Sequence, residues 1–149
     1  MTIDLRTARP DDYDAIIAVV DEWWGRPIAG VLPRLFLDHF HATSLVAELD
    51  GELAGFLIGF HSPSAPEQAY IHFVGVAPAT RGNGLARRLY EAFFAGAFRD
   101  GCTLVHAITS PVNTGSIAFH RAMGFDVRGP LANYDGPDVG RVLFERRLP

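Results

Sequence analysis

Short segments that are apolar, or that alternate between hydrophobic and polar residues as residues 3–6 do, recur along this chain, and each predicts a strand. Residues 45–49 and 53–60 are the clearest pair, because Asp50-Gly51 between them is a strong hairpin signal. The same pattern predicts further strands at residues 3–6, 70–76, 103–109, 125–128 and 142–147. The chain should therefore form a sheet of about seven strands.

Apolar residues at helical spacing separate these strands. Pro10 suits the first position of a helix that ends near Trp23-Trp24-Gly25, and a second helix begins near Pro33. A long helix runs to about Arg99, and a shorter one spans residues 116–123. This order predicts an α/β (α+β) fold with a mixed, mostly antiparallel sheet and helices on both faces. The strands flanking the long helix should be parallel, because a helical crossover joins them.

Composition narrows the class of protein. The length suits one domain over residues 1–149, and 48% hydrophobic against 20% charged residues indicates a globular chain. A net charge of −4 argues against nucleic-acid binding, which normally needs a basic face. No apolar run approaches the roughly 20 residues that span a bilayer. The N-terminus does not resemble a signal peptide and the lone Cys102 excludes an internal disulfide, so we expect a cytoplasmic protein.

The segment from Val76 to Ala86 carries the strongest chemical signal. Pro78 ends the preceding strand, and Arg81-Gly82-Asn83-Gly84 forms a turn before the long helix. Two glycines leave the backbone uncovered where the first helical N–H groups have no partner within the helix. Such a turn offers several donors to one anion, together with the positive end of the helix dipole, so it suits a phosphate or pyrophosphate.

Other phosphate-binding loops fit less well. The nucleotide P-loop needs a lysine, which this chain lacks, and the dinucleotide pattern G-x-G-x-x-G fails at Arg87. The remaining pattern, Arg-x-x-Gly-x-Ala from Arg81 to Ala86, resembles the coenzyme A loop of the GNAT superfamily of N-acetyltransferases. Residues 113–125 resemble the family's other hallmark, an Asn followed by a short helix that ends in Gly-Phe. The loop alone could be an ordinary strand–turn–helix junction, but two motifs in the right order identify the chain as a member.

The resemblance implies acetyl-CoA as co-substrate, without a metal. The pyrophosphate would meet backbone N–H groups of the turn, and the main chain at the end of the preceding strand would pair with the pantetheine arm and face the thioester carbonyl. Asn113 would hydrogen-bond the cofactor, although capping the following helix needs the same residue type. The cofactor-binding set implied by the resemblance is Val74, Gly75, Val76, Arg81, Gly82, Asn83, Gly84, Leu85, Ala86, Arg87, Asn113, Ser116 and Phe119.

Two departures from the family concern proton transfer. His120 stands where the family often has a tyrosine that protonates the leaving thiolate; a histidine there could do the same, hold CoA, or only pack in the helix. Tyr70 stands where many members have a glutamate base. His72 lies on the same face, at a position where arylalkylamine N-acetyltransferases carry a histidine, and it is either the proton acceptor or a packed strand histidine. The other histidines show no spacing that suggests a metal site.

The acceptor implied by the resemblance is a primary amine. Residues 1–52 hold ten acidic residues and four arginines, which would attract a cationic amine, although most of these acids are expected to be solvated helix-start charges. Trp23, Trp24 and Tyr134 are candidates for the acceptor pocket, with at least one tryptophan expected in the core. The amine should attack the thioester directly, because no motif makes Cys102 a nucleophile. The family often forms homodimers.

Two other functions stay open. The chain could transfer a different acyl group, or it could be a non-catalytic acyl-CoA-binding module. Such a module shares the Arg81–Ala86 loop but needs no base, acid or acceptor pocket. The sequence does not identify the acceptor.

Overall fold

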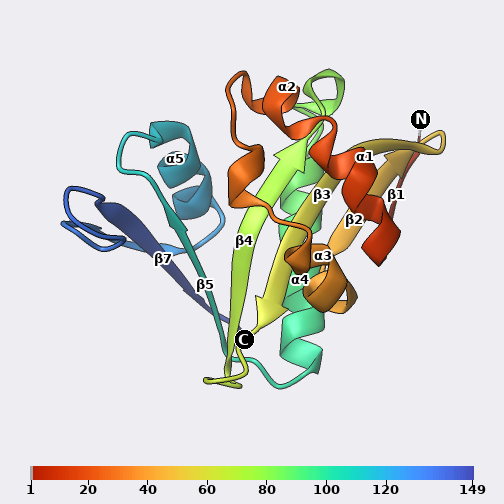
Figure 1. Ribbon diagram of the computed structural model, residues 1–149. Coiled ribbons are helices and arrows are strands. Elements are labelled where there is room, and N and C mark those ends of the chain that lie inside the picture. Colours follow the sequence, from red (N-terminus) through yellow and green to blue (C-terminus); the bar gives the residue numbers. More distant parts are fainter. Residues whose placement is uncertain (1) are drawn as a thin grey trace. The chain divides into compact units, whose positions relative to one another are not determined.

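A computed structural model describes residues 2–149 of the chain (Figure 1). The strands are β1 (Ile3–Thr7), β2 (Leu45–Leu49), β3 (Glu52–His61), β4 (Gln68–Val76), β5 (Leu104–Thr109), β6 (Asp126–Leu131) and β7 (Arg141–Arg147). The α-helices are α1 (Tyr13–Ile17), α2 (Val20–Trp24), α3 (Leu35–Phe40), α4 (Leu85–Arg99) and α5 (Thr114–Ala122). Short 3-10 helices are η1 (Pro10–Asp12), η2 (Ala29–Val31), η3 (His41–Thr43) and η4 (Pro78–Thr80).

The strands form a seven-stranded sheet in the order β1-β2-β3-β4-β5-β7-β6. β1 with β2, β2 with β3, β5 with β7 and β6 with β7 are antiparallel. β4 and β5 are parallel and pair through Gln68–Tyr70 and Leu104–His106. The predictions of a mixed, mostly antiparallel sheet and of a parallel pair around the long helix are therefore confirmed. β7 lies between β5 and β6, which the pattern of apolar residues does not encode.

The chain divides into two compact units. The first consists of the residues up to Phe60 together with Ile71–Gly96, and the second of His61–Tyr70 together with Ala97–Pro149. The first unit contains α1–α3, and the second contains α5. No helix of residues 2–149 is both long enough and apolar enough to cross a membrane.

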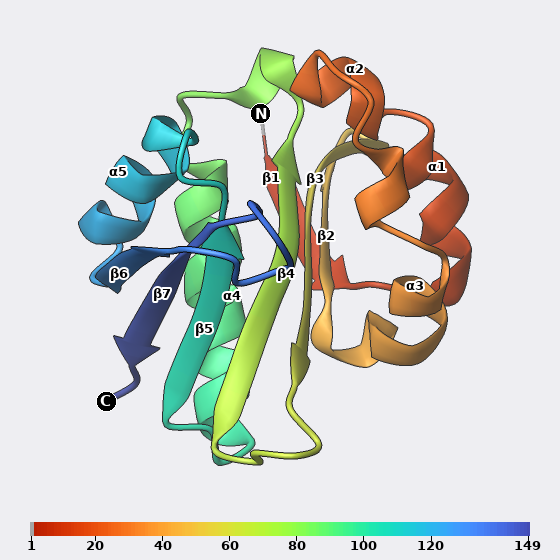
Figure 2. The same cartoon turned by 60° about the vertical axis from the view of Figure 1, so that its left-hand side comes forward.

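In the first unit, helices cover both faces of the strands (Figure 2). Phe56 of β3 points toward α1–α3, where its ring stacks on Trp23 with the centroids 6.0 Å apart. The neighbouring Gly55 points the other way, since a Cβ placed on it would contact Leu85 and Leu89 of α4. This alternation along one strand gives the sheet its two apolar faces.

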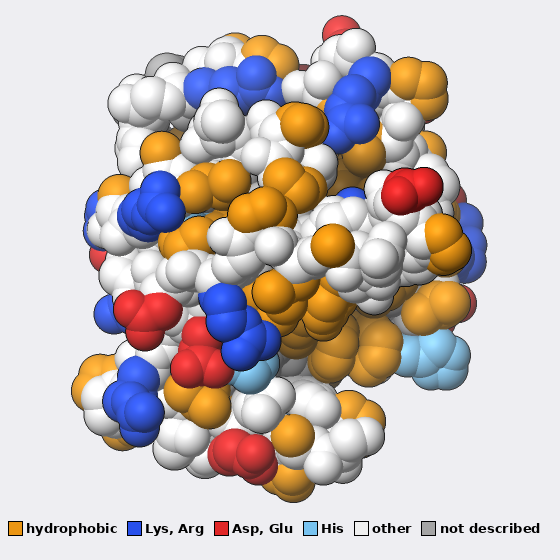
Figure 3. Space-filling view, turned by 90° about the vertical axis from the view of Figure 1, so that its left-hand side faces the viewer, with side chains coloured by type: hydrophobic (Ala, Val, Ile, Leu, Met, Phe, Trp, Pro, Cys, Tyr) orange, Lys and Arg blue, Asp and Glu red, His pale blue; other side chains and the backbone are white. Residues whose placement is uncertain are grey.

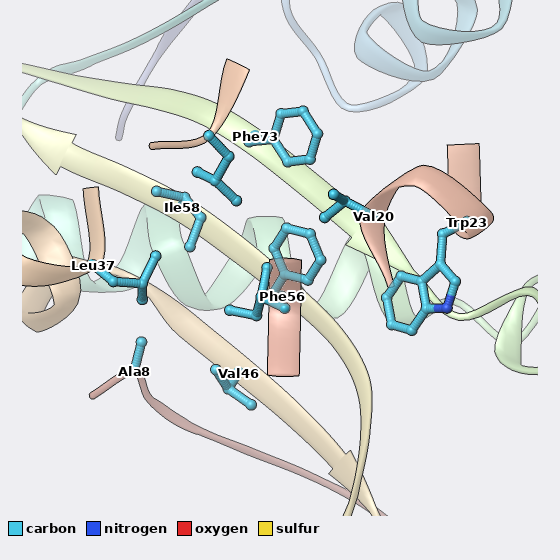
Figure 4. Packing of buried hydrophobic residues seen from close by; sticks show 10 residues of the cluster. Ala8, Val20, Trp23, Leu37, Val46, Phe56, Ile58 and Phe73 are labelled. Carbon is cyan, nitrogen blue, oxygen red and sulfur yellow. The ribbon is translucent and has the colours of Figure 1, made fainter. Parts of the chain in front are cut away.

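A cluster of buried apolar side chains joins the strands of the first unit to α1–α3 (Figure 4). Ile16, Val20, Leu37 and Phe56 in this cluster have no exposed surface. Burying a side chain of this size stabilises a fold by about 1.5–3 kcal/mol. The cluster consists of Ala8, Ile16, Val20, Trp23, Leu32, Leu37, Val46, Phe56, Ile58 and Phe73.

In the second unit, β7 has one buried face and one polar face. Val142 and Phe144 are buried, and the ring of Phe144 stacks on His120 of α5 with the centroids 3.9 Å apart. Leu143 and Glu145 point to the opposite face, because side chains alternate along a strand.

The first predicted helix is the main difference between prediction and structure. The chain forms η1, α1 and α2 in place of one continuous helix, with a break at Ala18-Val19. The β-branched residues around the break have low helix propensity, and burial of Ile16 and Val20 against the sheet decides the path of the chain. The predicted end of β6 at residue 128 is also wrong, because the strand continues to Leu131.

The Asp50-Gly51 hairpin is confirmed. Leu49 pairs with Glu52, so the turn has two residues. Asp50 and Gly51 have φ angles of 53° and 80°, and such a two-residue turn favours positive φ at both positions.

Candidate active site

The turn before α4 presents a series of backbone N–H groups at the start of a long helix. Gly82 and Gly84 have φ angles of 83° and 75°, in the left-handed region that glycine tolerates best. Arg81 N–H donates to a carbonyl of η4, and the next N–H that donates to the chain is that of Arg88, to Gly84 O at 3.1 Å. Within residues 2–149, the N–H groups of residues 82–87 therefore have no acceptor. Several donors at the start of a long helix fit an anion such as a pyrophosphate.

Arg81 fixes the position of this turn. Its Nη2 donates to Trp23 O at the end of α2 (2.7 Å), and its Nε donates to Val76 O at the end of β4 (3.2 Å). The side chain thus connects three segments of the first unit. Arg81 therefore has a structural role in addition to the cationic role expected from the sequence.

The end of β4 is closely packed. Gly75 is buried, and a Cβ on it would lie 2.6 Å from the ring of Phe56 and 3.0 Å from the ring of Trp24. Only glycine fits this position without displacing aromatic rings. Val74 and Val76 on either side are half-buried. Pantetheine binding by the main chain of these three residues stays a prediction.

His72 of β4 is held in one tautomer. Its Nε2 lies 2.6 Å from Val31 O, and because a carbonyl only accepts, Nε2 carries the proton. Nδ1 is therefore the basic nitrogen of the neutral ring. The ring stacks on Phe36 of α3, with the centroids 4.0 Å apart and the planes 3° from parallel. Burial lowers the pKa of His72 below its usual 6.5, against a smaller opposite effect of the Val31 hydrogen bond, so the ring is neutral at pH 7.

His120 lies in an aromatic environment in the second unit. Only 6% of its surface is exposed, and its ring contacts Phe119, Phe125 and Phe144. Nδ1 donates to Ser116 O, 2.8 Å away on the same helix. Burial lowers the pKa of His120, which disfavours the protonated form that an acid would need. These contacts favour the packing interpretation of His120.

Asn113 caps α5. Its Oδ1 accepts from Ser116 N–H at 3.1 Å, and its Nδ2 donates to Thr109 Oγ1 at 3.2 Å. The capping role considered for Asn113 is thus present. Binding of CoA by Asn113, Ser116 and Phe119 stays a prediction.

The three predicted acceptor residues lie in different environments. Trp23 is 8% exposed and belongs to the core, as expected for at least one tryptophan. Trp24 is half-buried and stacks on Phe73 at 4.6 Å between centroids. Tyr134 is 48% exposed and lines a pocket in the second unit.

Other residues of that pocket are not among those predicted from the sequence. His106 Nε2–H donates to Glu145 Oε2 at 2.8 Å, beside Tyr70. Spacing along the chain does not reveal this pair, because the two residues meet only through the pairing of β5 with β7. In the part of the chain that the structure describes, no group of three or more His, Cys, Asp or Glu residues could hold a metal ion.

The comparison with protein families decides the assignment. The profile of the Acetyltransferase (GNAT) family matches residues 7–125, which include both motifs. The chain belongs to the GNAT acetyltransferase family.

Curated relatives of this GNAT chain include several L-2,4-diaminobutyric acid acetyltransferases. The enzyme of Nocardia farcinica is 34% identical over 89 residues, which are 60% of this chain and 46% of that protein. The enzyme of Chromohalobacter salexigens is 41% identical over 115 residues, 76% of this chain and 60% of that protein. Three of these matches span about half the length of the relative. An acetyltransferase of Pectobacterium atrosepticum is 24% identical and is matched over 97% of this chain and 99% of its own length.

Solved structures share the GNAT fold. Ard1 of Thermoplasma volcanium has a TM-score of 0.83 at 18% identity, over 100% of this chain and 99% of that one. YncA of Salmonella typhimurium, solved with its cofactor acetyl-CoA, has a TM-score of 0.77 at 20% identity, over 100% and 95%. The diaminobutyrate acetyltransferase of Paenibacillus lautus, solved with L-2,4-diaminobutyric acid and coenzyme A, has a TM-score of 0.72 at 19% identity, over 96% and 94%. The fold predicted from the two motifs is confirmed.

Proposed function

We propose that this chain is an N-acetyltransferase that transfers the acetyl group of acetyl-CoA to a primary amine. The observation that carries the proposal is the turn before α4, where the N–H groups of residues 82–87 have no acceptor in the described chain. A Cβ on Gly82 or Gly84 would meet no protein atom within 4 Å, so an anion can approach the backbone freely. These donors fit the pyrophosphate of acetyl-CoA.

The relatives support an amine as the acceptor. Several are diaminobutyric acid acetyltransferases, and that substrate carries amino groups that are protonated at neutral pH. The structural neighbours solved with acetyl-CoA or coenzyme A support the donor. A cationic primary amine is therefore the acceptor class we propose.

The overall reaction requires two proton movements. Acetyl-CoA, when bound, supplies a thioester whose carbonyl carbon is electrophilic. The ammonium group of the acceptor first loses a proton to a base, and its nitrogen then forms a bond to the carbonyl carbon while the carbon–sulfur bond breaks. The second proton on that nitrogen ends on the CoA thiol, so one proton remains with the base.

His72 is the base in this proposal. Its Nε2–H is held by Val31 O, which leaves Nδ1 to accept a proton. The stack on Phe36 fixes the plane of the ring and so the direction of the Nδ1 lone pair. A neutral imidazole in a fixed orientation is suited to general base catalysis near pH 7.

Cys102 gives no support for an acyl-enzyme. It is 1% exposed, and its Sγ–H donates to Pro66 O at 3.5 Å. Burial raises the pKa of the Cys102 thiol, which disfavours the nucleophilic thiolate. Direct transfer between bound donor and amine is therefore the route we propose.

A panel of primary amines tests the function, with release of free CoA read by a thiol reagent. We expect release from acetyl-CoA that depends on one class of amine. Tight binding of acetyl-CoA by calorimetry without release for any amine would identify a non-catalytic module. Faster release of CoA from a longer acyl-CoA would show that the longer acyl group, and not acetyl, is the group transferred. The cytoplasmic location, the single domain and the homodimer stay predictions.

A further inference from the structure

The second unit contains a pocket of about 230 Å³ over β5, β7 and β6, which we call the polar pocket. Its polar lining consists of Tyr70, His106, Asp126, Arg128, Tyr134 and Glu145. Acidic, basic and histidine side chains lie next to one another on the side of the molecule that carries β7 (Figure 3). The combination of both charges with a histidine–carboxylate pair distinguishes this pocket from a purely acidic surface.

Strand register explains why these polar residues share one face. Tyr70 pairs with His106, His106 pairs with Glu145, and Glu145 pairs with Asp126. Residues paired across adjacent strands point to the same face of a sheet, so these four form one row across β4, β5, β7 and β6. The next row on this face consists of Ile108, Leu143 and Arg128.

Asp126 and Arg128 are the two charged residues of the polar pocket that form no ion pair in the described part of the chain. Glu145 accepts from His106 at 2.8 Å, but within residues 2–149 neither Asp126 nor Arg128 forms an ion pair. Their Cα atoms are two residues apart on one strand, a separation of about 6.6 Å. A carboxylate and a guanidinium at this spacing suit a ligand that carries both an ammonium and a carboxylate group.

The tyrosines supply neutral hydrogen-bonding groups to the same space. Burial raises the pKa of Tyr70 to about 12, so its hydroxyl keeps its proton at pH 7. Tyr134 belongs to the loop before β7, and Arg141 connects this loop to the strand by an ion pair with Asp135 at 2.8 Å. The volume is smaller than the roughly 300–1,000 Å³ typical of pockets for drug-sized ligands, and it suits a small metabolite better than a peptide.

We propose that the polar pocket binds the amino-acid head group of a diamino acid, with Arg128 on the carboxylate and Asp126 on the α-ammonium. The side-chain amine of that ligand then remains for acetylation. This assignment of the acceptor rests on the proposed function. This assignment also explains the presence of Arg128. A simple diamine has no carboxylate, so its ammonium group would face the positive charge of Arg128.

Matched pairs of ligands test the proposal by calorimetry. L-2,4-Diaminobutyrate, L-ornithine and L-lysine are compared with their decarboxylated counterparts 1,3-diaminopropane, 1,4-diaminobutane and 1,5-diaminopentane. At least one amino acid should bind roughly 10-fold or more tightly than its diamine. A ratio of this size corresponds to the binding free energy of one hydrogen bond between charged groups. Arg128→Gln should abolish this preference. Asp126→Asn should weaken the binding of both the amino acid and its diamine. Arg99→Gln removes an exposed cation outside the polar pocket, so it should change neither the preference for the amino acid nor the affinity for either ligand.

Several outcomes would overturn the proposal. These are equal binding within every pair, no binding of any amino acid, or a preference that persists in folded Arg128→Gln protein. The CoA-release assay separates this inference from the proposed function. If CoA release depends on amines but shows no preference for amino acids over diamines, the assignment of the polar pocket is wrong and the proposed function stands. If amino acids bind preferentially but no CoA is released, the proposed acetyltransferase function is wrong and the pocket assignment stands.

Discussion

Burial lowers the pKa of both His72 and His120, but the surroundings of the two rings suit different roles. His72 Nε2–H donates to a backbone carbonyl of η2, and the structure gives Nδ1 no partner in the described chain. His120 is enclosed by aromatic rings, and its Nδ1–H donates within its own helix. Substitutions of the two residues should therefore have different consequences.

His72→Ala should lower kcat/KM roughly 100-fold, a typical effect of removing a general base, and leave acetyl-CoA affinity unchanged. Because burial lowers the pKa of His72, activity of the parent should fall as the pH drops through a value below 6.5. The variant should lack this step. Steady-state rates from pH 5 to 8 measure both effects, and His39→Ala, which removes an exposed histidine of α3, is the control. A parental rate and pH profile in His72→Ala would assign proton transfer to another group.

His120→Phe should keep kcat within a few-fold of the parent. Phenylalanine preserves the stack on Phe144, and the loss of the hydrogen bond to Ser116 O costs about 0.5–1.5 kcal/mol of stability. If His120 were instead the acid, kcat would fall strongly and His120→Tyr would restore part of it. Measuring kcat and the unfolding temperature of both variants distinguishes packing from proton transfer.

At the scale of elements, we expect the turn before α4 to determine the affinity for acetyl-CoA. Gly84→Val should weaken acetyl-CoA binding at least about 10-fold, because a side chain there stands where the phosphate oxygens approach the backbone. Gly101→Val is a matched control: Gly84 and Gly101 have φ angles of 75° and 94°, and a Cβ on either meets no protein atom within 4 Å. Both variants thus carry a similar backbone strain of about 1–2 kcal/mol. Calorimetry that shows equal affinity in the two folded variants would reject the turn as the pyrophosphate site.

The sequence was sufficient to predict those elements whose conformation is set by local residues and not by packing against distant parts of the chain. Asp50-Gly51 specifies a two-residue turn, and the glycines before α4 specify a turn with positive φ angles, wherever these segments lie in the fold. The segment from Pro10 to Trp24 was predicted less well, because packing on the sheet breaks its helix. The His106–Glu145 pair was missed because β7 lies beside β5, and such a neighbour relation depends on the whole topology.

At the scale of the whole molecule, we expect the acidic N-terminal third to contribute less to acceptor binding than its net charge suggests. Asp12 pairs with Arg6, Asp14 pairs with Arg34, and Asp21 accepts two backbone N–H groups of the following loop. These carboxylates support local structure, as expected for helix-start acids. We therefore propose that a cationic amine is attracted by a carboxylate without an ion-pair partner in the described chain, such as Asp126 of the polar pocket.

The stability of the fold in acid should depend on Asp12. Arg6 donates two hydrogen bonds to this carboxylate (2.7 and 2.9 Å) and one to Glu48 (2.7 Å), and so connects β1, η1 and β2. The hydrogen bond from Arg6 lowers the pKa of Asp12 below its usual 3.8, against the effect of burial. A carboxyl whose pKa is lower in the folded state stabilises fully above its unfolded pKa, and this contribution is lost as the pH falls through the folded value.

Asp12→Asn should therefore lower the free energy of unfolding by about 1–3 kcal/mol at pH 7, the cost of leaving a charged hydrogen-bonding group without its partner. The difference from the parent should shrink as the pH falls below 3.8, because the parent then loses the same interaction. Urea denaturation at a series of pH values measures this difference. Asp11→Asn is the control, since the Asp11 side chain is 85% exposed and lies 3.7 Å from Arg9, a pair expected to contribute little. A difference between Asp12→Asn and the parent that stays constant from pH 7 to pH 3 would show that Asp12 stabilises the fold by its shape and not by its charge.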